Sequence, residues 1–367
     1  MEPIAHTFTG MALAAAGLRR ATPLAGTALF MGANAPDVDV FSGFVAYYES
    51  VAFRRGWTHG VLALALWPFV LTGVLLLWDR YVRLKRKPDA APARAGPLLA
   101  VTAVAVASHP ALDWLNNYGL RWLMPFSGRW FYGDALFIVD PWVWLVLGGV
   151  AFLTFSQSKL ARVRWAVFFA LSSWLILANT ELVPAASVVL WFAGAGALVA
   201  ARWRLRDATP VTLERAAQAG IAVAAVYMVA MVGASAAARA EVRAAAAAQG
   251  IVPEDVMVAP VPADPFSGQV IVMTRDEYYT GTFNWLNEPR LRLDGERTSR
   301  PRGIAFELAS RDAAARRFLV WSRYPVIDLE PDRGAIRVTF TDARYPQGQL
   351  EGPKVYLPAS AVESGGN

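Results

Sequence analysis

The sequence predicts a mainly α protein: a polytopic transmembrane helical bundle with an N-terminal helical hairpin, followed by a small C-terminal α+β soluble domain. Of the 367 residues, 55% are hydrophobic and only 17% are charged, and the mean hydropathy is +0.33. These values are typical of a membrane protein and not of an ordinary soluble domain. Long apolar runs fill the first two thirds of the chain, whereas the last third is richer in charge and in alternating segments.

Six apolar runs are candidates for transmembrane helices, because about 20 such residues cross a hydrocarbon core of about 30 Å. The second run carries His109, Pro110 and Asp113 near its far end. Ionisable residues at membrane depth are costly and usually line a cavity. The six runs are residues 61–78, 97–115, 141–157, 165–180, 182–201 and 216–238.

The N-terminal segment is predicted to form a tight helical hairpin. Residues 4–18 and 21–33 are each too short for a comfortable span, and they meet at Arg19 and Arg20. If these arginines extend toward the cytoplasmic side, His6 and residues 34–39 return to the opposite side.

Basic loops set the expected topology. The loop after residues 61–78 should be cytoplasmic by the positive-inside rule, and the clusters near residues 159–164 and 202–215 agree with it. His59 and His109 then reach the extracytoplasmic side, as do residues from about 240 onward. The first loop contains Arg80, Arg83, Lys85, Arg86, Lys87 and Arg94. We therefore expect a multi-pass protein of the cell inner membrane, with the histidines and the C-terminal domain outside the cytoplasm.

Composition also limits the chemistry. The chain has no cysteine, so disulfides and thiolate ligands are excluded and any metal is held by nitrogen and oxygen. The net charge of +6 and the pI near 9.7 fit basic loops between membrane spans, so nucleic acid is not an expected partner.

The three histidines of the chain, His6, His59 and His109, all lie in its first third beside polar or acidic residues. Imidazole and carboxylate are the ligands of zinc and of other catalytic divalent metals. His109 and Asp113, spaced i and i+4, share one helix face. Alone, each motif also fits a polar turn or a helix end at the interface. Together, the charge argument places all of them at one end of the bundle.

Four motifs in order resemble the YdjM-like membrane-bound metal-dependent hydrolases: His6, N-x-P-D-x-D at 34–39, R-G-x-T-H at 55–59 and H-P-x-x-D at 109–113. The resemblance covers roughly residues 1–160. The family is described as inner-membrane hydrolases and looks distantly related to zinc-dependent phospholipase C and the S1/P1 nucleases. Phospholipase C relatives use further histidines that this chain lacks, so one or two ions are expected, most simply Zn²⁺.

The resemblance implies the roles of individual residues. The implied metal ligands are His6, Asp37, His59, His109 and Asp113. Asp39, Asp134 and Asp140 are the candidates for the catalytic acid that takes a proton, and the sequence does not rank them.

The implied reaction is metal-assisted hydrolysis of a phosphoester or phospholipid at the outer membrane face. A membrane lipid is the expected partner, because its headgroup reaches a site at the lipid boundary while its chains stay in hydrocarbon. Arg55, Arg121 and Arg129 lie near the motifs and are candidates either for binding phosphate or for anchoring at the membrane surface.

The chain is predicted to divide into a metal-site membrane domain (1–160), additional transmembrane helices (161–240) and an extracytoplasmic α+β domain (250–367). In the last part, residues 269–274 and 335–341 are predicted strands, residues 304–321 include an amphipathic helix, and residues 252–265 are the expected linker.

A second class of function stays open at this point: a non-catalytic transporter or scaffold with a structural metal or a polar cluster. A transporter typically has repeated or broken helices around a midplane site, whereas these motifs gather at one end and no internal repeat is evident. A structural metal has a closed ligand shell, and a catalytic one keeps an open position.

Overall fold

The structure is a computed structural model that describes residues 1–44, 47–345 and 352–363. The chain divides into two compact units. The first comprises Met1–Val38, Arg55–Ser235 and Ala259–Pro265, and the second comprises Asp39–Arg54, Ala236–Val258 and Phe266–Asn367. The predicted fold class is confirmed, because the first unit is a bundle of apolar helices and the second contains antiparallel sheets with short helices.

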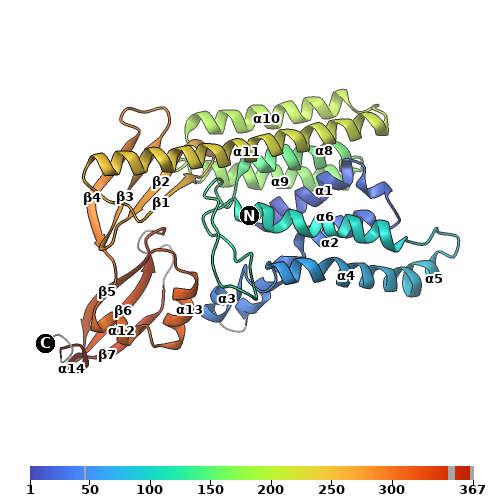
Figure 1. Cartoon of the computed structure of the whole chain (residues 1–367). Helices are drawn as coiled ribbons and strands as arrows, with labels where there is room; N and C mark the ends of the chain where they lie inside the picture. Colours follow the sequence, from blue (N-terminus) through green and yellow to red (C-terminus); the bar gives the residue numbers. More distant parts are fainter. Residues whose placement is uncertain (45–46, 346–351, 364–367) are drawn as a thin grey trace. The chain divides into compact units, whose positions relative to one another are not determined.

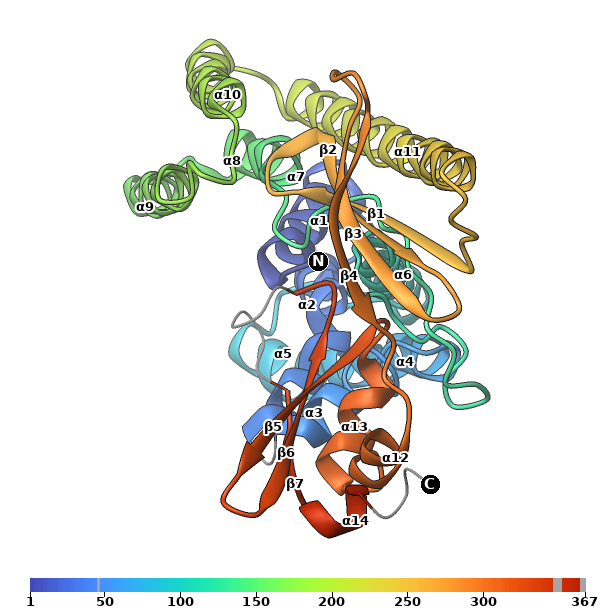
Figure 2. The ribbon, with the colours of Figure 1, turned by 90° about the vertical axis from the view of Figure 1, so that its left-hand side faces the viewer.

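The helices of the first unit lie side by side (Figure 1), and Figure 2 shows α9 and α10 end-on. They are α1 (Pro3–Ala15), η1 (Leu18–Arg20), α2 (Ala25–Asn34), α4 (Val61–Trp78), η3 (Asp79–Arg83), α5 (Leu84–Arg86), α6 (Ala95–Trp114), α7 (Pro141–Val143), η4 (Trp144–Gly148), α8 (Gly149–Phe155), α9 (Lys159–Leu177) and α10 (Ala185–Arg204). Two further elements, η2 (Ala35–Phe44) and α11 (Pro210–Ala248), begin in this unit and end in the other.

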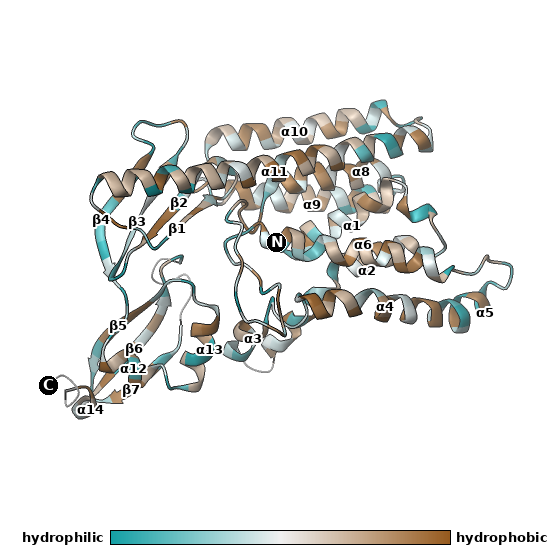
Figure 3. Cartoon of the chain, viewed as in Figure 1, coloured by the Kyte–Doolittle hydropathy of each residue, from teal (hydrophilic) through white to brown (hydrophobic). Residues whose placement is uncertain are grey.

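Among the described residues, five helices are long and apolar enough to cross a membrane. Hydrophobic colouring predominates along them in Figure 3. The run predicted at 141–157 forms a shorter apolar helix, Pro141–Phe155. At 1.5 Å per residue it is about 22 Å long, less than the hydrocarbon core of about 30 Å. The five candidate spans are Val61–Arg86, Ala95–Trp114, Lys159–Leu177, Ala185–Arg204 and Pro210–Ala248.

The predicted N-terminal hairpin is present as α1 and α2, with Arg19 and Arg20 in the connecting turn. Small residues let its helices approach their neighbours closely. A Cβ atom at Gly10 would lie 2.6 Å from the Leu29 carbonyl oxygen, and one at Gly32 would lie 2.8 Å from the Ala105 Cβ on α6. The hairpin therefore packs tightly both on itself and on α6, which fixes where α2 ends.

Basic residues gather at the end of the first unit where the hairpin turns. The Arg94 amide donates a hydrogen bond to Thr22 Oγ1 at 2.7 Å, and Arg20 pairs with Glu214. Arg202 Nε donates to Ser156 Oγ at 2.9 Å, next to the end of α8. Four loops that are distant in sequence thus share one basic end, as a positive-inside arrangement requires.

The second unit contains two antiparallel sheets. Its core combines Ala238, Val242 and Ala246 of α11 with valines of the first sheet and Phe283. The four-stranded sheet has the order β1 (Asp255–Val261), β2 (Asp264–Met273), β3 (Glu277–Asn284), β4 (Leu291–Ser299), and the three-stranded sheet has the order β5 (Pro325–Asp332), β6 (Ala335–Asp342), β7 (Lys354–Pro358). The helices of this unit are α3 (Tyr47–Phe53), α12 (Ile304–Ala309), α13 (Ala313–Trp321) and α14 (Ala359–Glu363).

One local prediction for the second unit is wrong, and another is confirmed. Residues 252–265 are not simply a linker, since they contain all of β1 and the start of β2. Residues 304–321 do include an amphipathic helix, α13, and a separate short helix, α12, precedes it. Asp312 starts α13 because it accepts hydrogen bonds from the Ala314 and Ala315 amides.

Candidate metal centre

Four predicted ligands converge in the first unit: Asp37, His59, His109 and Asp113. Each offers a ligand atom, and these atoms all lie within 4.8 Å of one another. Asp37 comes from η2 directly after the hairpin, His59 from the turn before α4, and the other two from α6. Both histidines and Asp113 are fully buried, whereas the Asp37 side chain is 13% exposed. Three segments far apart in sequence therefore build one site.

The distances between ligand atoms suit a single cation. Nε2 of His59 lies 3.1 Å from Nε2 of His109, and Asp113 Oδ2 lies 3.2 and 3.4 Å from the same two nitrogens. Asp37 Oδ1 is 3.9 Å from His59 Nε2 and 3.7 Å from His109 Nε2. Ligands bound at about 2.0–2.2 Å, with angles between 90° and the tetrahedral value, are separated by about 3.0–3.5 Å. The four atoms thus sit close to the corners of a coordination polyhedron.

Asp113 supplies an independent test of this fit. Its Oδ2 atom is buried and has no hydrogen-bond donor among the described residues. A buried carboxylate oxygen without such a donor is costly, and a cation satisfies it. Burial by itself raises the pKa of Asp37, but the contact with His109 outweighs burial and lowers that pKa to about 2. Asp37 is thus an ionised oxygen ligand, and the set of two imidazoles and two carboxylates fits zinc.

The outer nitrogens of both imidazoles are held by hydrogen-bond partners. His109 Nδ1 lies 2.7 Å from the Ala33 carbonyl oxygen, which can only accept, so Nδ1 carries the hydrogen. His59 Nδ1 lies 2.9 Å from Thr58 Oγ1. Such partners fix the orientation of a metal-binding histidine and direct its other nitrogen at the ion. The Nε2 atoms are the ones that face each other here.

Arg55 neutralises the second oxygen of Asp113. Its Nη2 atom lies 3.0 Å from Asp113 Oδ1, and its Nη1 donates to Asn116 Oδ1 at 3.0 Å. The guanidinium is 4% exposed and stacks over the Tyr118 ring, 4.6 Å from the ring centroid. The α-amine of Met1 also contacts Asp113 Oδ1. Arg55 therefore holds Asp113 so that Oδ2 faces the histidines.

His6, also predicted as a ligand, lies beside the four-residue cluster and is not one of its members. Its ring stacks on His109 with centroids 3.7 Å apart, and its Nε2 lies 3.3 Å from Asp113 Oδ1. Its Nδ1 is buried and has no hydrogen-bond partner among the described residues. His6 is thus placed to support the carboxylate of Asp113 or to join the ligand set, and its role as a ligand stays a prediction.

The three acids predicted to take a proton have different surroundings. Asp140 caps α7: its Oδ1 accepts from the Trp142 and Val143 amides at 2.9 and 3.0 Å, and its Oδ2 accepts from the Tyr227 hydroxyl at 3.0 Å. Asp134 is buried in a left-handed backbone conformation, and its carbonyl accepts from Ser235 Oγ at 2.7 Å. Asp39 lies in the second unit, where its Oδ1 is 3.7 Å from Arg54 Nε. Their catalytic role stays a prediction.

The three arginines that are candidates for phosphate binding differ in their burial. Arg55 and Arg121 are buried, and Arg121 stacks over Trp130 with its guanidinium carbon 5.0 Å from the ring centroid. Arg129 is exposed. Sequence reasoning missed that Arg55 pairs with a metal ligand. The motif R-G-x-T-H places Thr58 next to His59, so the sequence could have indicated that contact. The motif does not indicate the contact of the Ala33 carbonyl with the site.

The part of the chain that holds the candidate site matches a known protein family. Residues 1–183 match the family described as YdjM inner membrane protein. The N-terminal half of this chain belongs to the YdjM family. All four clustered ligands, together with His6 and Arg55, lie within the YdjM region.

One curated relative is an uncharacterized protein, YfhP, of Bacillus subtilis (strain 168). It is 25% identical over 155 residues, which span 40% of this chain and 43% of the relative. The chain thus aligns with less than half of that protein's length. No solved structure shows a significant match to the chain.

Proposed function

We propose that this protein is a membrane-embedded metal-dependent hydrolase that acts on a phosphoester or phospholipid. The observation that carries the proposal is the convergence of His59, His109, Asp37 and Asp113, with the outer nitrogens of both rings already hydrogen-bonded. A bound divalent ion would lower the pKa of water and polarise the ester oxygen. Membership of an inner membrane family and five apolar helices support a multi-pass inner-membrane location.

The chain's own residues supply binding and orientation. Asp37, His59, His109 and Asp113 hold the cation, and Zn²⁺ is the ion that this ligand set favours. Arg55 fixes the direction of the Asp113 carboxylate. Asp37 is the only one of the four with an exposed side-chain fraction, so we place the approach of substrate on its side. We assign the site and the C-terminal domain to the extracytoplasmic side, on the charge pattern of the loops.

Asp140 is one of the three candidate proton acceptors, and both of its oxygens accept hydrogen bonds, from its own helix and from the Tyr227 hydroxyl. These bonds favour a helix-capping role for Asp140.

The test is the metal content of the full-length protein purified in detergent and dialysed after loading with Zn²⁺. We expect about one or two ions per chain in the wild type and loss of bound zinc in the His109→Ala, Asp113→Ala double variant. Ser108→Ala is the matched control, since Ser108 precedes His109 and its hydroxyl donates to the Ala105 carbonyl at 2.7 Å within its own helix. Equal zinc content in the double variant and the wild type would overturn the assignment.

Activity is measured on the same samples with bis(p-nitrophenyl) phosphate and with phosphatidylglycerol vesicles. Hydrolysis that needs zinc and is lost in the double variant supports the enzyme. Zinc binding without hydrolysis of any phosphoester would instead support a structural metal or a transporter.

A further inference from the structure

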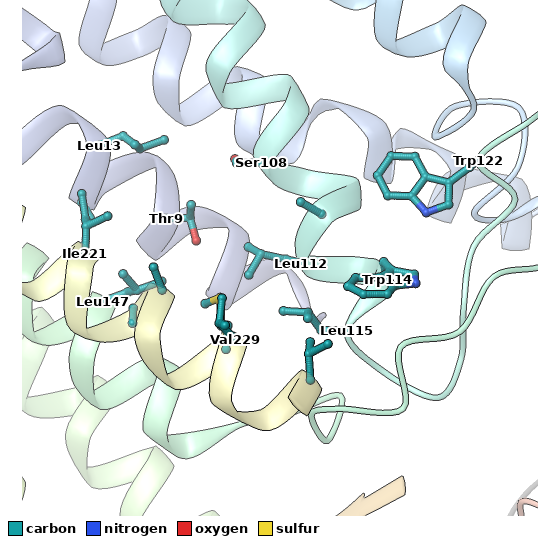
Figure 4. A pocket seen from close by; sticks show the side chains of 16 residues that line it. Thr9, Leu13, Ser108, Leu112, Trp114, Leu115, Trp122, Leu147, Ile221 and Val229 are labelled. Carbon is teal, nitrogen blue, oxygen red and sulfur yellow. The ribbon is translucent and has the colours of Figure 1, made fainter. Parts of the chain in front are cut away.

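A largely apolar groove runs along the metal-bearing helix α6. It has a volume of about 530 Å³ and lies between α6, α1 and α11, with Leu147 of η4 at its base. Figure 4 shows Leu112 of α6 and Leu115, directly after that helix, facing the same space as Ile221 and Val229 of α11. Of its sixteen lining residues only Thr9 and Ser108 are polar. Its volume falls in the usual range for a ligand site.

The two hydroxyls in the groove do not provide polar recognition. Thr9 Oγ1 donates to the Ala5 carbonyl at 2.8 Å, and Ser108 Oγ donates to the Ala105 carbonyl at 2.7 Å. Each hydroxyl is thus satisfied within its own helix. Apart from the indole N–H groups of Trp114 and Trp122 at one end, the groove offers its occupant hydrocarbon contacts, which suits an alkyl chain and does not suit a charged or sugar-like molecule.

The groove lies at membrane depth, and one of its ends lies near the segment that carries His59. Both α6 and α11 are candidate spans, so bilayer hydrocarbon is the medium beside it. At one end of the groove, the Trp122 carbonyl accepts a hydrogen bond from the Val61 amide at 2.8 Å, two residues after the ligand His59. Trp114 and Trp122 lie at one end of the groove, and Leu13 and Ile221 lie at the other (Figure 4).

The length of the groove matches one acyl chain. Its wall on α11 runs from Ile221 to Val232, which is about 16 Å at 1.5 Å per residue. One leaflet is half of a hydrocarbon core of about 30 Å, or about 15 Å. Alanines keep the space open, since Ala12, Ala111, Ala224 and Ala225 line it from three helices.

We infer that this groove binds one acyl chain of a bilayer phospholipid and presents the attached phosphoester to the metal centre. The inference rests on the proposed hydrolase and narrows its substrate class from phosphoesters in general to lipid phosphoesters. The headgroup lies at the level of Asp113, and the alkyl chain extends from there past Ser108 toward Leu13 and Ile221.

Occupancy is tested without relying on catalysis. The full-length protein is placed in nanodiscs that contain phosphatidylglycerol with a photoreactive diazirine in one acyl chain, and labelled residues are mapped by mass spectrometry. We expect labels on residues 108–115 and 221–232. Ala225→Trp should reduce them by about tenfold or more, since the new ring fills the groove from an exposed wall position. Ala230→Trp, an exposed position of the same helix that does not line the groove, should leave them unchanged.

Equal labelling in the wild type and Ala225→Trp, or labels spread evenly over the outer faces of α11, would mean annular lipid only and would overturn the inference.

A kinetic arm separates failure of the groove from failure of the enzyme. Ala225→Trp should raise KM for phosphatidylglycerol in mixed micelles about tenfold and leave hydrolysis of soluble bis(p-nitrophenyl) phosphate unchanged. If the zinc-loaded wild type hydrolyses neither substrate, the proposed function is rejected. The labelling experiment would still show whether the groove binds an acyl chain. Equal KM values for phosphatidylglycerol in the wild type and in Ala225→Trp would reject the role of the groove and leave the proposed hydrolase standing.

Discussion

The Nε2 atoms of His59 and His109 lie 3.1 Å apart although the two residues are 50 positions apart in the sequence. His109 offers a lone pair at Nε2, because its Nδ1 donates to the Ala33 carbonyl. The two rings therefore face each other in a way that a shared cation stabilises. Since one ring precedes α4 and the other lies on α6, the cation also ties these helices together.

Zinc should therefore stabilise the fold through His59. At a free zinc concentration of about 1,000 times Kd, a ligand that binds only the folded state adds about 4 kcal/mol to the free energy of unfolding. Thermal unfolding of the purified protein, with and without zinc, measures this shift. We expect His59→Ala to abolish the zinc-dependent shift and Ser108→Ala to retain it. A full shift in His59→Ala would show that zinc binds elsewhere.

Removing Arg55 should destabilise the zinc-free protein more than the zinc-loaded one. Arg55→Gln leaves the buried Asp113 carboxylate without its guanidinium, and losing one partner of a buried ion pair costs about 3–5 kcal/mol. A bound cation compensates part of that charge. Unfolding curves in both states test the difference, with the exposed Arg129→Gln as a control expected to change stability by less than about 0.5 kcal/mol. Equal losses with and without zinc would separate Arg55 from the metal site.

Local spacing in the sequence predicted part of the metal centre. His109 and Asp113 share a helix face because of their i, i+4 spacing, and the structure places His109 Nε2 3.4 Å from Asp113 Oδ2. The hairpin that carries His6 and leads into Asp37 could be predicted because two short apolar runs meet at a pair of arginines. Periodicity and charge were sufficient for both predictions.

Long-range packing determines the contacts of the metal centre that the sequence does not predict. The Ala33 carbonyl reaches His109 only because α2 approaches α6 closely at Gly32, and no pattern in the sequence measures that approach. The prolines of residues 252–265 favour a linker, yet these residues form β1 at an edge of its sheet, where Pro260 needs no ladder hydrogen bond. The role of Arg55 depended on a partner 58 positions away along the chain.

The close approach at Gly32 predicts opposite effects for two glycine substitutions. Gly32→Ala places a methyl group 2.8 Å from the Ala105 Cβ, so α2 and α6 must separate, at a cost of about 1–3 kcal/mol. Gly73→Ala on α4 meets nothing within 4 Å and should stabilise the helix by about 0.5–1 kcal/mol. Zinc titrations should show weaker binding only for Gly32→Ala, because Ala33 holds His109. Unchanged zinc affinity would mean that this packing does not position the ligand.

Acid should loosen the second unit through Asp342. Burial alone raises the pKa of Asp342, but the Arg344 guanidinium, 2.8 Å away, and the Ser322 hydroxyl outweigh burial and lower that pKa. The stability that the ionised carboxylate contributes is therefore complete above its unfolded pKa of about 3.9 and is lost as the pH falls through the lower folded value.

Hydrogen exchange of the Arg323 and Tyr324 amides reports on this carboxylate, because both donate to Asp342 Oδ2, at 2.8 and 3.2 Å. In the full-length protein we expect their protection to be constant from pH 7 to 5 and to decrease below about pH 4. Asp342→Asn should reduce their protection at neutral pH and remove the acid-dependent step. A wild-type protein that loses this protection between pH 7 and 5 would contradict the assignment.

The topology depends on whether the short helix Pro141–Phe155 crosses the membrane. Between Lys87 and Gly250 lie four of the five long spans, and this helix adds a fifth crossing only if it is transmembrane. The Phe155 end of this short helix lies at the basic end of the first unit, because the Arg19 guanidinium lies over the Phe155 ring at 5.4 Å and Arg202 donates to Ser156. We therefore expect it to cross despite its length of about 22 Å.

Fusions of alkaline phosphatase and of a fluorescent protein after Lys87 and after Gly250 should then report opposite sides, with Lys87 cytoplasmic. A second pair of fusions, after Ser127 and after Ser158, brackets the short helix itself and should also report opposite sides. If Lys87 and Gly250 report the same side while Ser127 and Ser158 agree with each other, the helix does not cross. The C-terminal domain would then be cytoplasmic.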